Sequence, residues 1–145
     1  MKHISKSKGF TILEMIVVLV MIGLIMGLVG PRLFNQADKA KVKTAETQIK
    51  MLKGALQVMR LDLGRFPTTS EGLQLLSTIP ANGSIKDKWQ GPYLEDKLPL
   101  DPWSNPFQYR LEASETQSFV LYSQGSDKQD GGEDDASDIG YLPRL

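Results

Sequence analysis

Residues 42–63 read VKTAETQIKMLKGALQVMRLDL, and their pattern carries most of the information about the fold. Apolar residues recur every three or four positions, which places them on one face of an α-helix. This apolar stripe consists of Val42, Ala45, Ile49, Leu52, Leu56, Met59 and Leu63. The spacing predicts an amphipathic helix packed on a small domain. The Gly64–Pro67 segment, Gly-Arg-Phe-Pro, predicts where that helix ends.

Before this stripe, residues 10–29 form an apolar run whose only charged residue is Glu14. As a helix, the run is about long enough to cross the hydrocarbon core of a bilayer. Pro31, with Gly30 beside it, predicts a kink or an interruption between the two segments. We therefore expect one long N-terminal helix, with its first half in a membrane and its second half on the domain.

After the helix, Thr68-Thr69-Ser70-Glu71 has the spacing of a capping box and predicts a short helix through Leu76. Residues 80–106 are rich in Pro, Gly, Asn and Asp, which predicts an irregular segment. This segment also contains three large aromatic residues, so we expect it to pack on the domain: Trp89, Tyr93 and Trp103.

Two stretches near the C-terminus alternate between apolar and polar residues, 107–111 and 118–122. Alternation is typical of half-buried strands, and residues 114–117 between them suit a hairpin turn. The predicted fold class is therefore α+β, with one long helix against a small antiparallel sheet.

The composition argues against several functions. The formal net charge is +0, which argues against a nucleic-acid binder that depends on a basic surface. The chain has no cysteine, and its only histidine is His3. The usual general base and any thiolate nucleophile are therefore missing from the rest of the chain. No pair of carboxylates suggests acid–base chemistry, so we do not expect an enzyme.

Glu14 is the feature of the apolar run that needs an explanation, because an ionised carboxylate in a bilayer is costly. A secretory signal peptide is a poor match, since a small-residue cleavage site does not follow the run. A simple membrane anchor leaves Glu14 unexplained. The third interpretation is cleavage between Gly9 and Phe10, after a short basic leader, which keeps the apolar helix on the mature protein.

Residues 9–14, Gly-Phe-Thr-Ile-Leu-Glu, resemble the processing site of type IV pilins and pseudopilins, G-F-T-L-x-E, with Ile12 in place of Leu. The resemblance implies that a membrane aspartyl peptidase removes the leader, residues 1–9, and methylates the amino group of Phe10. It also implies that residues 10–30 form a transmembrane and filament-core helix. Residues 31–145 would then form the periplasmic domain.

The same resemblance implies that Glu14 pairs with the terminal amine of a neighbouring subunit in a filament. Two other arrangements are open for a carboxylate at this place. Glu14 could pair with the Phe10 amine of its own chain, one helical turn away, or extend to the membrane interface.

Three segments of the domain are similar to the major pseudopilin of the type II secretion system: residues 65–73, residues 98–107, and residues 123–127 with 137–140. Within them, Ser104 replaces the usual Gly and Phe107 replaces Tyr. The resemblance implies a structural subunit of a periplasmic filament that is assembled from the inner membrane and drives export of folded proteins. The N-terminus would be cytoplasmic and the C-terminal domain periplasmic.

The partners implied are other copies of the chain, minor pseudopilins, the prepilin peptidase, an inner-membrane assembly platform and, before assembly, membrane lipid. Two alternatives stay open. One is a type IV pilin, although the disulfide common in those proteins is impossible here. The other is a monomeric membrane-anchored module that binds calcium.

Residues 127–138 are dense in Asp and Gly, which is typical either of a solvated loop or of a calcium site. An EF-hand is excluded because Gln129 and Gly131 do not fit the third and fifth places of its loop, which take Asp or Asn, and because the flanking segments are typical of strand and loop, not of helices. The resemblance implies a structural Ca²⁺ here. It implies Asp127 and Asp138 as ligands with the carbonyl of Gln124, and we add Asp135 and Ser137, with Asp134 in reserve. Lys128 stands where the family usually has Gly.

Overall fold

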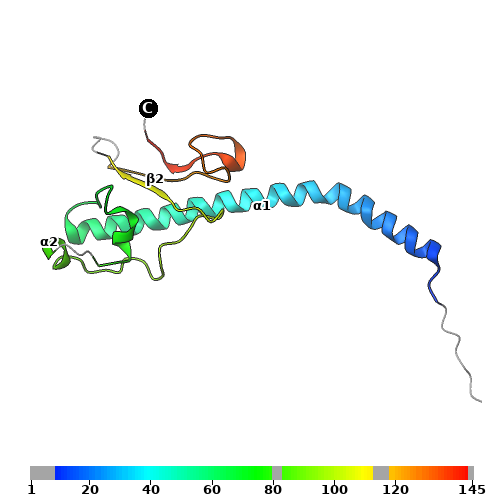
Figure 1. Ribbon diagram of the computed structural model, residues 1–145, viewed down its shortest axis with the longest axis horizontal. Helices are drawn as coiled ribbons and strands as arrows, with labels where there is room; N and C mark the ends of the chain where they lie inside the picture. Colours follow the sequence, from blue (N-terminus) through cyan, green and yellow to red (C-terminus); the bar gives the residue numbers. More distant parts are fainter. Residues whose placement is uncertain (1–8, 80–82, 113–117, 144–145) are drawn as a thin grey trace, which may run out of the picture. The chain divides into compact units, whose positions relative to one another are not determined.

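The computed structural model describes residues 9–79, 83–112 and 118–143, apart from the side chains of residues 34, 35 and 84. A long helix, a small three-stranded antiparallel sheet and short connecting elements make up this part of the chain (Figure 1), which confirms the predicted α+β class. The elements are α1 (Ile12–Leu63), η1 (Gly72–Leu76), α2 (Gly83–Lys86), β1 (Gln108–Leu111), β2 (Phe119–Ser123), η2 (Asp134–Ala136) and β3 (Ile139–Tyr141). Residues 1–8 of the predicted leader and the predicted turn at 114–117 lie outside the described residues.

The chain divides into two compact units, Met1–Ala37 and Asp38–Leu145. In the first unit, helix α1 begins at Ile12 and continues through Pro31. Of the predicted kink or interruption at Pro31, the interruption is wrong, and the single long helix that the sequence predicts is confirmed. A proline removes one backbone hydrogen bond, and a long helix can absorb that loss without ending.

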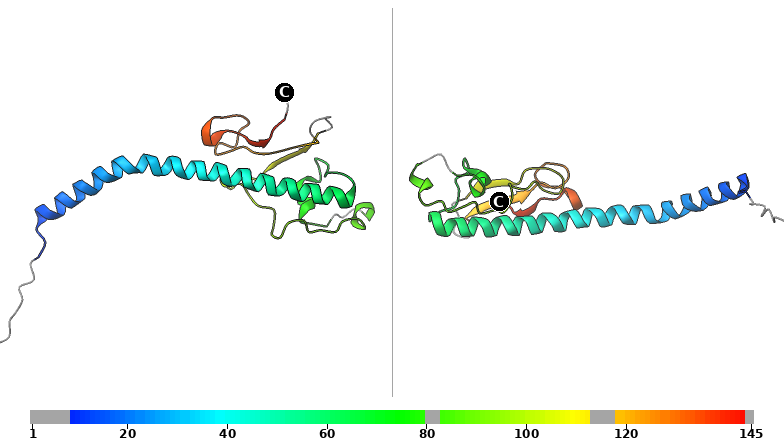
Figure 2. Two further views of the ribbon diagram at one scale, coloured as in Figure 1. Left: turned by 180° about the vertical axis from the view of Figure 1, so that it is seen from behind. Right: turned by 90° about the horizontal axis from the view of Figure 1, so that it is seen from below.

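In the second unit, the sheet and the connecting segments lie along the second half of α1 (Figure 2). The apolar stripe of α1 forms one side of the core, as predicted. Ala45, Ile49, Leu52, Leu56 and Met59 are buried, while Val42 and Leu63 are partly buried against the same core. The other side consists of Phe66, Leu73, Leu75, Leu76, Leu94, Phe107, Phe119, Leu121 and Ile139. The rest of the domain thus packs against the apolar stripe of α1.

Helix α1 ends at Leu63, where the sequence predicts its end. Gly64 has a φ of 77°, and its N–H donates a hydrogen bond of 2.8 Å to the carbonyl of Arg60. A glycine in the left-handed region satisfies a terminal helix carbonyl at no steric cost, so this residue is the C-terminal cap.

The sheet has the strand order β1-β2-β3, and both pairs are antiparallel. Tyr109 of β1 lies opposite Leu121 of β2, and Ser123 of β2 lies opposite Ile139 of β3. Strand β2 is central, and all its residues except Tyr122 are buried. Strand β3 was not predicted, because three residues are too few to show an alternating pattern.

The irregular segment packs on the core, as its aromatic residues predict. Trp89, Tyr93 and Trp103 are partly buried against the core cluster. The indole N–H of Trp89 donates to the carbonyl of Leu75 at 2.8 Å, which attaches the segment to η1. Packing of the rings therefore orders a segment that has little regular structure.

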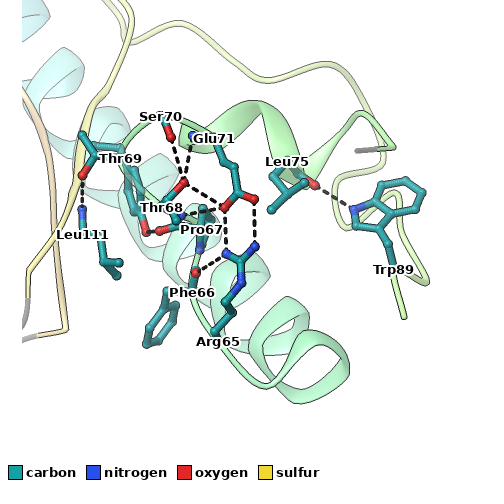
Figure 3. A network of polar contacts seen from close by, with 11 residues as sticks. Arg65, Phe66, Pro67, Thr68, Thr69, Ser70, Glu71, Leu75, Trp89 and Leu111 are labelled. Carbon is teal, nitrogen blue, oxygen red and sulfur yellow. Dashed lines mark hydrogen bonds and ion pairs between the residues drawn. The ribbon is translucent and has the colours of Figure 1, made fainter. Parts of the chain in front are cut away.

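The two reciprocal hydrogen bonds of the predicted capping box are present (Figure 3), but they hold the turn between α1 and η1 and do not cap η1, whose N-cap residue is Glu71. The Thr68 N–H donates to Glu71 Oε2 at 2.8 Å, and the Glu71 N–H donates to Thr68 Oγ1 at 3.2 Å. The Arg65 guanidinium donates to both oxygens of Glu71, at 2.7 and 2.8 Å. The helix that follows, η1, is of the 3₁₀ type.

This network predicts a loss of stability in acid. Hydrogen bonds from Arg65, with further ones from Thr68, lower the pKa of Glu71 from 4.5 to about 2 and outweigh the opposing effect of burial. A carboxylate whose pKa is lowered by folding stabilises the fold at pH values above its unfolded-state pKa. This stabilisation is lost as the pH falls through the folded-state pKa, which is about 2 for Glu71. We expect Glu71→Gln to cost about 1–2 kcal/mol at pH 7, because Arg65 is partly exposed, and much less at pH 2.

The measurement is thermal unfolding of the wild-type chain and the variant in detergent micelles between pH 7 and pH 2. Glu46→Gln is the matched control, because Glu46 pairs with the exposed Lys43 and should contribute little. A difference between wild type and Glu71→Gln that does not change with pH would contradict the prediction.

Candidate functional site

The first site is the beginning of helix α1, where Thr11 is the capping residue. Thr11 Oγ1 accepts a hydrogen bond of 3.2 Å from the Glu14 N–H, and its carbonyl accepts one of 3.1 Å from the Met15 N–H. Glu14 therefore lies in the first helical turn, at the third helical position. An anion is favoured there because the helix dipole places partial positive charge at this end.

The apolar side chains that follow are exposed along the whole run. Ile12 is 82% exposed, Leu13 is 73% exposed and Leu24 is 71% exposed. By length and composition, α1 contains a stretch that can cross a membrane, and none of that stretch is buried within the chain. A continuous apolar surface of this kind requires a bilayer or other protein surfaces to cover it.

The second site is the loop between β2 and β3, which contains every predicted calcium ligand and begins with Gln124. Asp127 Oδ1 accepts from the N–H of Gln129 at 3.0 Å. Asp138 Oδ2 accepts from the Gly131 N–H at 2.8 Å, and the Asp138 N–H donates to the Gly131 carbonyl at 3.1 Å. Asp138 Oδ1 is buried, and no group in the described part of the chain donates to it.

The other predicted ligands take part in the folding of the loop itself. The carbonyl of Asp135 accepts from the Ser126 N–H at 3.0 Å. The Ser137 hydroxyl donates to the carbonyl of Asp134 at 2.7 Å. Across residues 9–79, 83–112 and 118–143, no three carboxylates gather closely enough to hold a metal ion by side chains alone.

Asp130 is a loop residue that the sequence analysis missed. Its Oδ1 accepts from the amide of Gln124 at 2.8 Å and from the hydroxyl of Tyr122 at 2.9 Å. These two hydrogen bonds, that of Gln124 first, lower the pKa of Asp130. Burial and then the contact with Asp130 raise the pKa of Tyr122 to about 12. Asp130 thus attaches the tip of the loop to the end of β2 through two side-chain hydrogen bonds.

Ser104 and Lys128 stand where the family that the sequence resembles usually has Gly, and both residues lie in left-handed turns. Ser104 has a φ of 65°, and Lys128 has a φ of 61°. A residue with a Cβ is less stable in this region by roughly 1–2 kcal/mol, part of which glycine loses again through its greater freedom when unfolded. Both turns therefore form despite the substitution, at some cost in stability.

We expect Ser104→Gly and Lys128→Gly each to stabilise the fold by about 0.5–1 kcal/mol. Thermal unfolding of the full chain in detergent micelles measures this. Ser126→Gly is the control, because Ser126 is not among the residues with positive φ and should lose stability instead. Equal losses in all three variants would contradict the assignment of strain.

An apolar helix with a glutamate in its first turn, continued into a helix-on-sheet domain, defines the class of pilin-like proteins. Residues 4–30 match the model of the prokaryotic N-terminal methylation motif, and residues 32–142 match that of the type II secretion system (T2SS), protein G. The chain belongs to the protein G family of the type II secretion system, and is a pseudopilin.

Individual relatives agree with this assignment. The type II secretion system core protein G of Pseudomonas aeruginosa is 38% identical over 93% of this chain and 94% of its own length. That of Vibrio cholerae is 39% identical over 97% of this chain and 94% of its own. The crystal structure of the major pseudopilin from the type 2 secretion system of enterohaemorrhagic Escherichia coli matches with a TM-score of 0.59. It is 30% identical and covers 75% of this chain and 92% of that one.

Proposed function

We propose that the chain is cut between Gly9 and Phe10 and anchored in the inner membrane by residues 10–30. It then joins other copies in a periplasmic filament whose growth drives export of folded proteins. The chain is a structural subunit of the type II secretion pseudopilus. The observation that carries the proposal is the exposed apolar run of α1, which lies within the match to the N-terminal methylation motif.

The apolar run and Glu14 support different steps of this assembly. The apolar run would first be covered by lipid and then by equivalent helices of other copies, which removes its surface from water in both states. Glu14 needs a partner of opposite charge when the helices come together. The methylated amine of Phe10 from a neighbouring copy can supply it. The assembly platform and the minor pseudopilins belong to this proposal as partners.

The test is the intact mass of the protein extracted from membranes of a cell that contains a prepilin peptidase. We expect loss of residues 1–9 and the addition of one methyl group. Gly9→Val should stay uncut, whereas Gly23→Val, which alters another glycine with open space around it, should be cut normally. An uncut wild-type chain would overturn the proposal.

We also propose that the β2–β3 loop holds a structural Ca²⁺. The carboxylates of Asp127 and Asp138 and the carbonyl of Gln124 would bind it, with Asp135 and Ser137 and with Asp134 in reserve. The buried oxygen of Asp138, which accepts no hydrogen bond in the described chain, supports this. The loop offers the hard carboxylate and carbonyl oxygens that Ca²⁺ prefers. When bound, the ion would neutralise carboxylates that otherwise repel one another.

Thermal unfolding of the full chain in detergent micelles tests this site. A ligand present at 100 times its Kd stabilises the folded state by about 2.7 kcal/mol, so added Ca²⁺ should raise the Tm by several degrees relative to EDTA. Asp127→Ala should abolish the shift, whereas Glu133→Gln, an exposed acid of the same loop, should retain it. The same Tm with Ca²⁺ and with EDTA would overturn the calcium proposal and leave the filament proposal standing.

A further inference from the structure

Three buried polar side chains lie close together in the domain, and none of them belongs to the apolar run of α1 or to the proposed calcium ligands. Asp101 and Asn105 are each 4% exposed, and Ser123 is fully buried. Asp101 and Asn105 come from the segment before β1, and Ser123 is the last residue of β2. Burying such groups is costly unless they are hydrogen-bonded, so their arrangement requires an explanation.

The carboxylate of Asp101 is the centre of this arrangement, because it accepts three hydrogen bonds. Oδ1 accepts from the N–H groups of Trp103 and Asn105, at 3.0 and 2.7 Å. Oδ2 accepts from the Ser123 hydroxyl at 2.5 Å. Hydrogen bonds to an ionised acceptor are stronger than neutral ones, which offsets the cost of burial. The carboxylate therefore connects the segment before β1 to the end of β2.

The arrangement continues to Gly125, whose peptide groups are held from both sides. The Gly125 N–H donates to Ser123 Oγ at 3.2 Å, and its carbonyl accepts from Asn105 Nδ2 at 3.2 Å. Because the Ser123 hydroxyl donates its hydrogen bond to Asp101, the lone pairs of its oxygen remain available to accept a hydrogen bond from the Gly125 N–H. Asp101 thereby fixes the direction of the hydrogen bond that holds the Gly125 N–H.

Gly125 is also packed against the far side of the loop. It has a φ of 62°, and a Cβ added there would lie 2.6 Å from the Asp135 carbonyl oxygen and 2.9 Å from that of Ser137. The next residue, Ser126, donates its N–H to the same Asp135 carbonyl. The position of Gly125 therefore determines how the two ends of the loop meet.

We propose that Asp101 is a positioning residue for the C-terminal loop, which it sets through Ser123, Asn105 and Gly125 before any ion binds. The loop then presents residues 126–138 in a defined arrangement on the surface of the subunit. An effect on calcium affinity follows as well, and that part rests on the proposed calcium site.

Hydrogen exchange of the full chain in detergent micelles with EDTA tests the inference without the metal. Ser123→Ala removes the link to Gly125 and leaves both backbone hydrogen bonds to Asp101 in place. We expect the N–H groups of Ser126 and Asp138 to exchange at least about tenfold faster, while those of the β1–β2 pair change little. If the loop binds Ca²⁺, its Kd should rise roughly 10- to 100-fold, as for other residues that orient ligands.

Two further variants separate positioning from general stability. Thr68→Ala removes a hydroxyl from the Arg65–Glu71 network and should leave the exchange of Ser126 and Asp138 unchanged. Asp101→Asn places an amide donor where the carboxylate accepts from Ser123, so it should reproduce the loop-selective loss.

Each result decides for or against the inference. Wild-type loop exchange in Ser123→Ala, or equal loss of protection throughout the domain, would overturn it. Wild-type exchange in Asp101→Asn alone would overturn the role of Asp101. Selective loss in a protein that shows no Ca²⁺ binding would support the positioning role and refute only the calcium proposal.

Discussion

Replacing Glu14 with Ala should abolish assembly of the pseudopilus while the chain stays folded and bound to the membrane. The side chain lies in the first turn of α1, beside an apolar run whose side chains are all exposed. Glu14 is not a member of the hydrophobic core described for the chain, whose residues all belong to the unit that begins at Asp38. The loss should therefore appear in assembly. Without Glu14, the charged amine of Phe10 would be left unpaired beside packed helices, which costs several kcal/mol.

Counting filaments by electron microscopy and measuring export in the same cells tests this prediction. Glu46→Ala is the matched control, since Glu46 is a second glutamate of α1 with an exposed ion pair to Lys43, and its loss should leave assembly normal. Normal filaments from the Glu14 variant would show that this carboxylate has no pairing role between subunits. Normal unfolding of the variant domain is also part of the expected result.

Replacing Asp101 with Ala should give the largest loss of folding stability expected from a single polar substitution in this chain. It would leave the N–H groups of Trp103 and Asn105 and the Ser123 hydroxyl without their acceptor. Buried donors that lose a charged acceptor cost about 3–5 kcal/mol together. Since a domain of this size has a total stability of about 5–15 kcal/mol, a large part of the population could unfold.

Thermal unfolding of the full chain in detergent micelles gives this loss, with protein recovery from membranes as a second measure. Asp96→Ala is the control, because Asp96 is an exposed acid of the same irregular segment and should change stability by no more than about 0.5 kcal/mol. Similar Tm values for the two variants would show that burial of Asp101 contributes nothing specific to stability.

Features that depend on neighbours in the sequence were predictable. The stripe from Val42 to Leu63 indicated both the helix and its buried face, because an α-helix places every third or fourth residue on the same side. The capping box of Thr68 and Glu71 was equally local. The two longer strands were visible for the same reason, whereas β3 is too short to show a pattern.

Local rules also failed at three residues for identifiable reasons. Pro31 is an unfavourable residue inside a helix, yet α1 continues through it. Lys128 and Ser104 are unfavourable in left-handed turns, yet both turns form. In each case the preference of one residue is worth a few kcal/mol or less, and the hydrogen bonds and packing around it outweigh that preference.

The sequence by itself determined the apolar run with its glutamate, the amphipathic half of α1 and the α+β class, because each depends on the spacing of residues close together in the chain. Only the tertiary structure decided that Asp101 and Asn105 meet Ser123 and Gly125, or that Asp130 attaches the acidic loop to Tyr122. These contacts join residues from separate segments of the domain. Their partners are selected by the packing of the sheet on α1 and by the need of buried polar groups for hydrogen bonds, and neither leaves a periodic signal in the sequence.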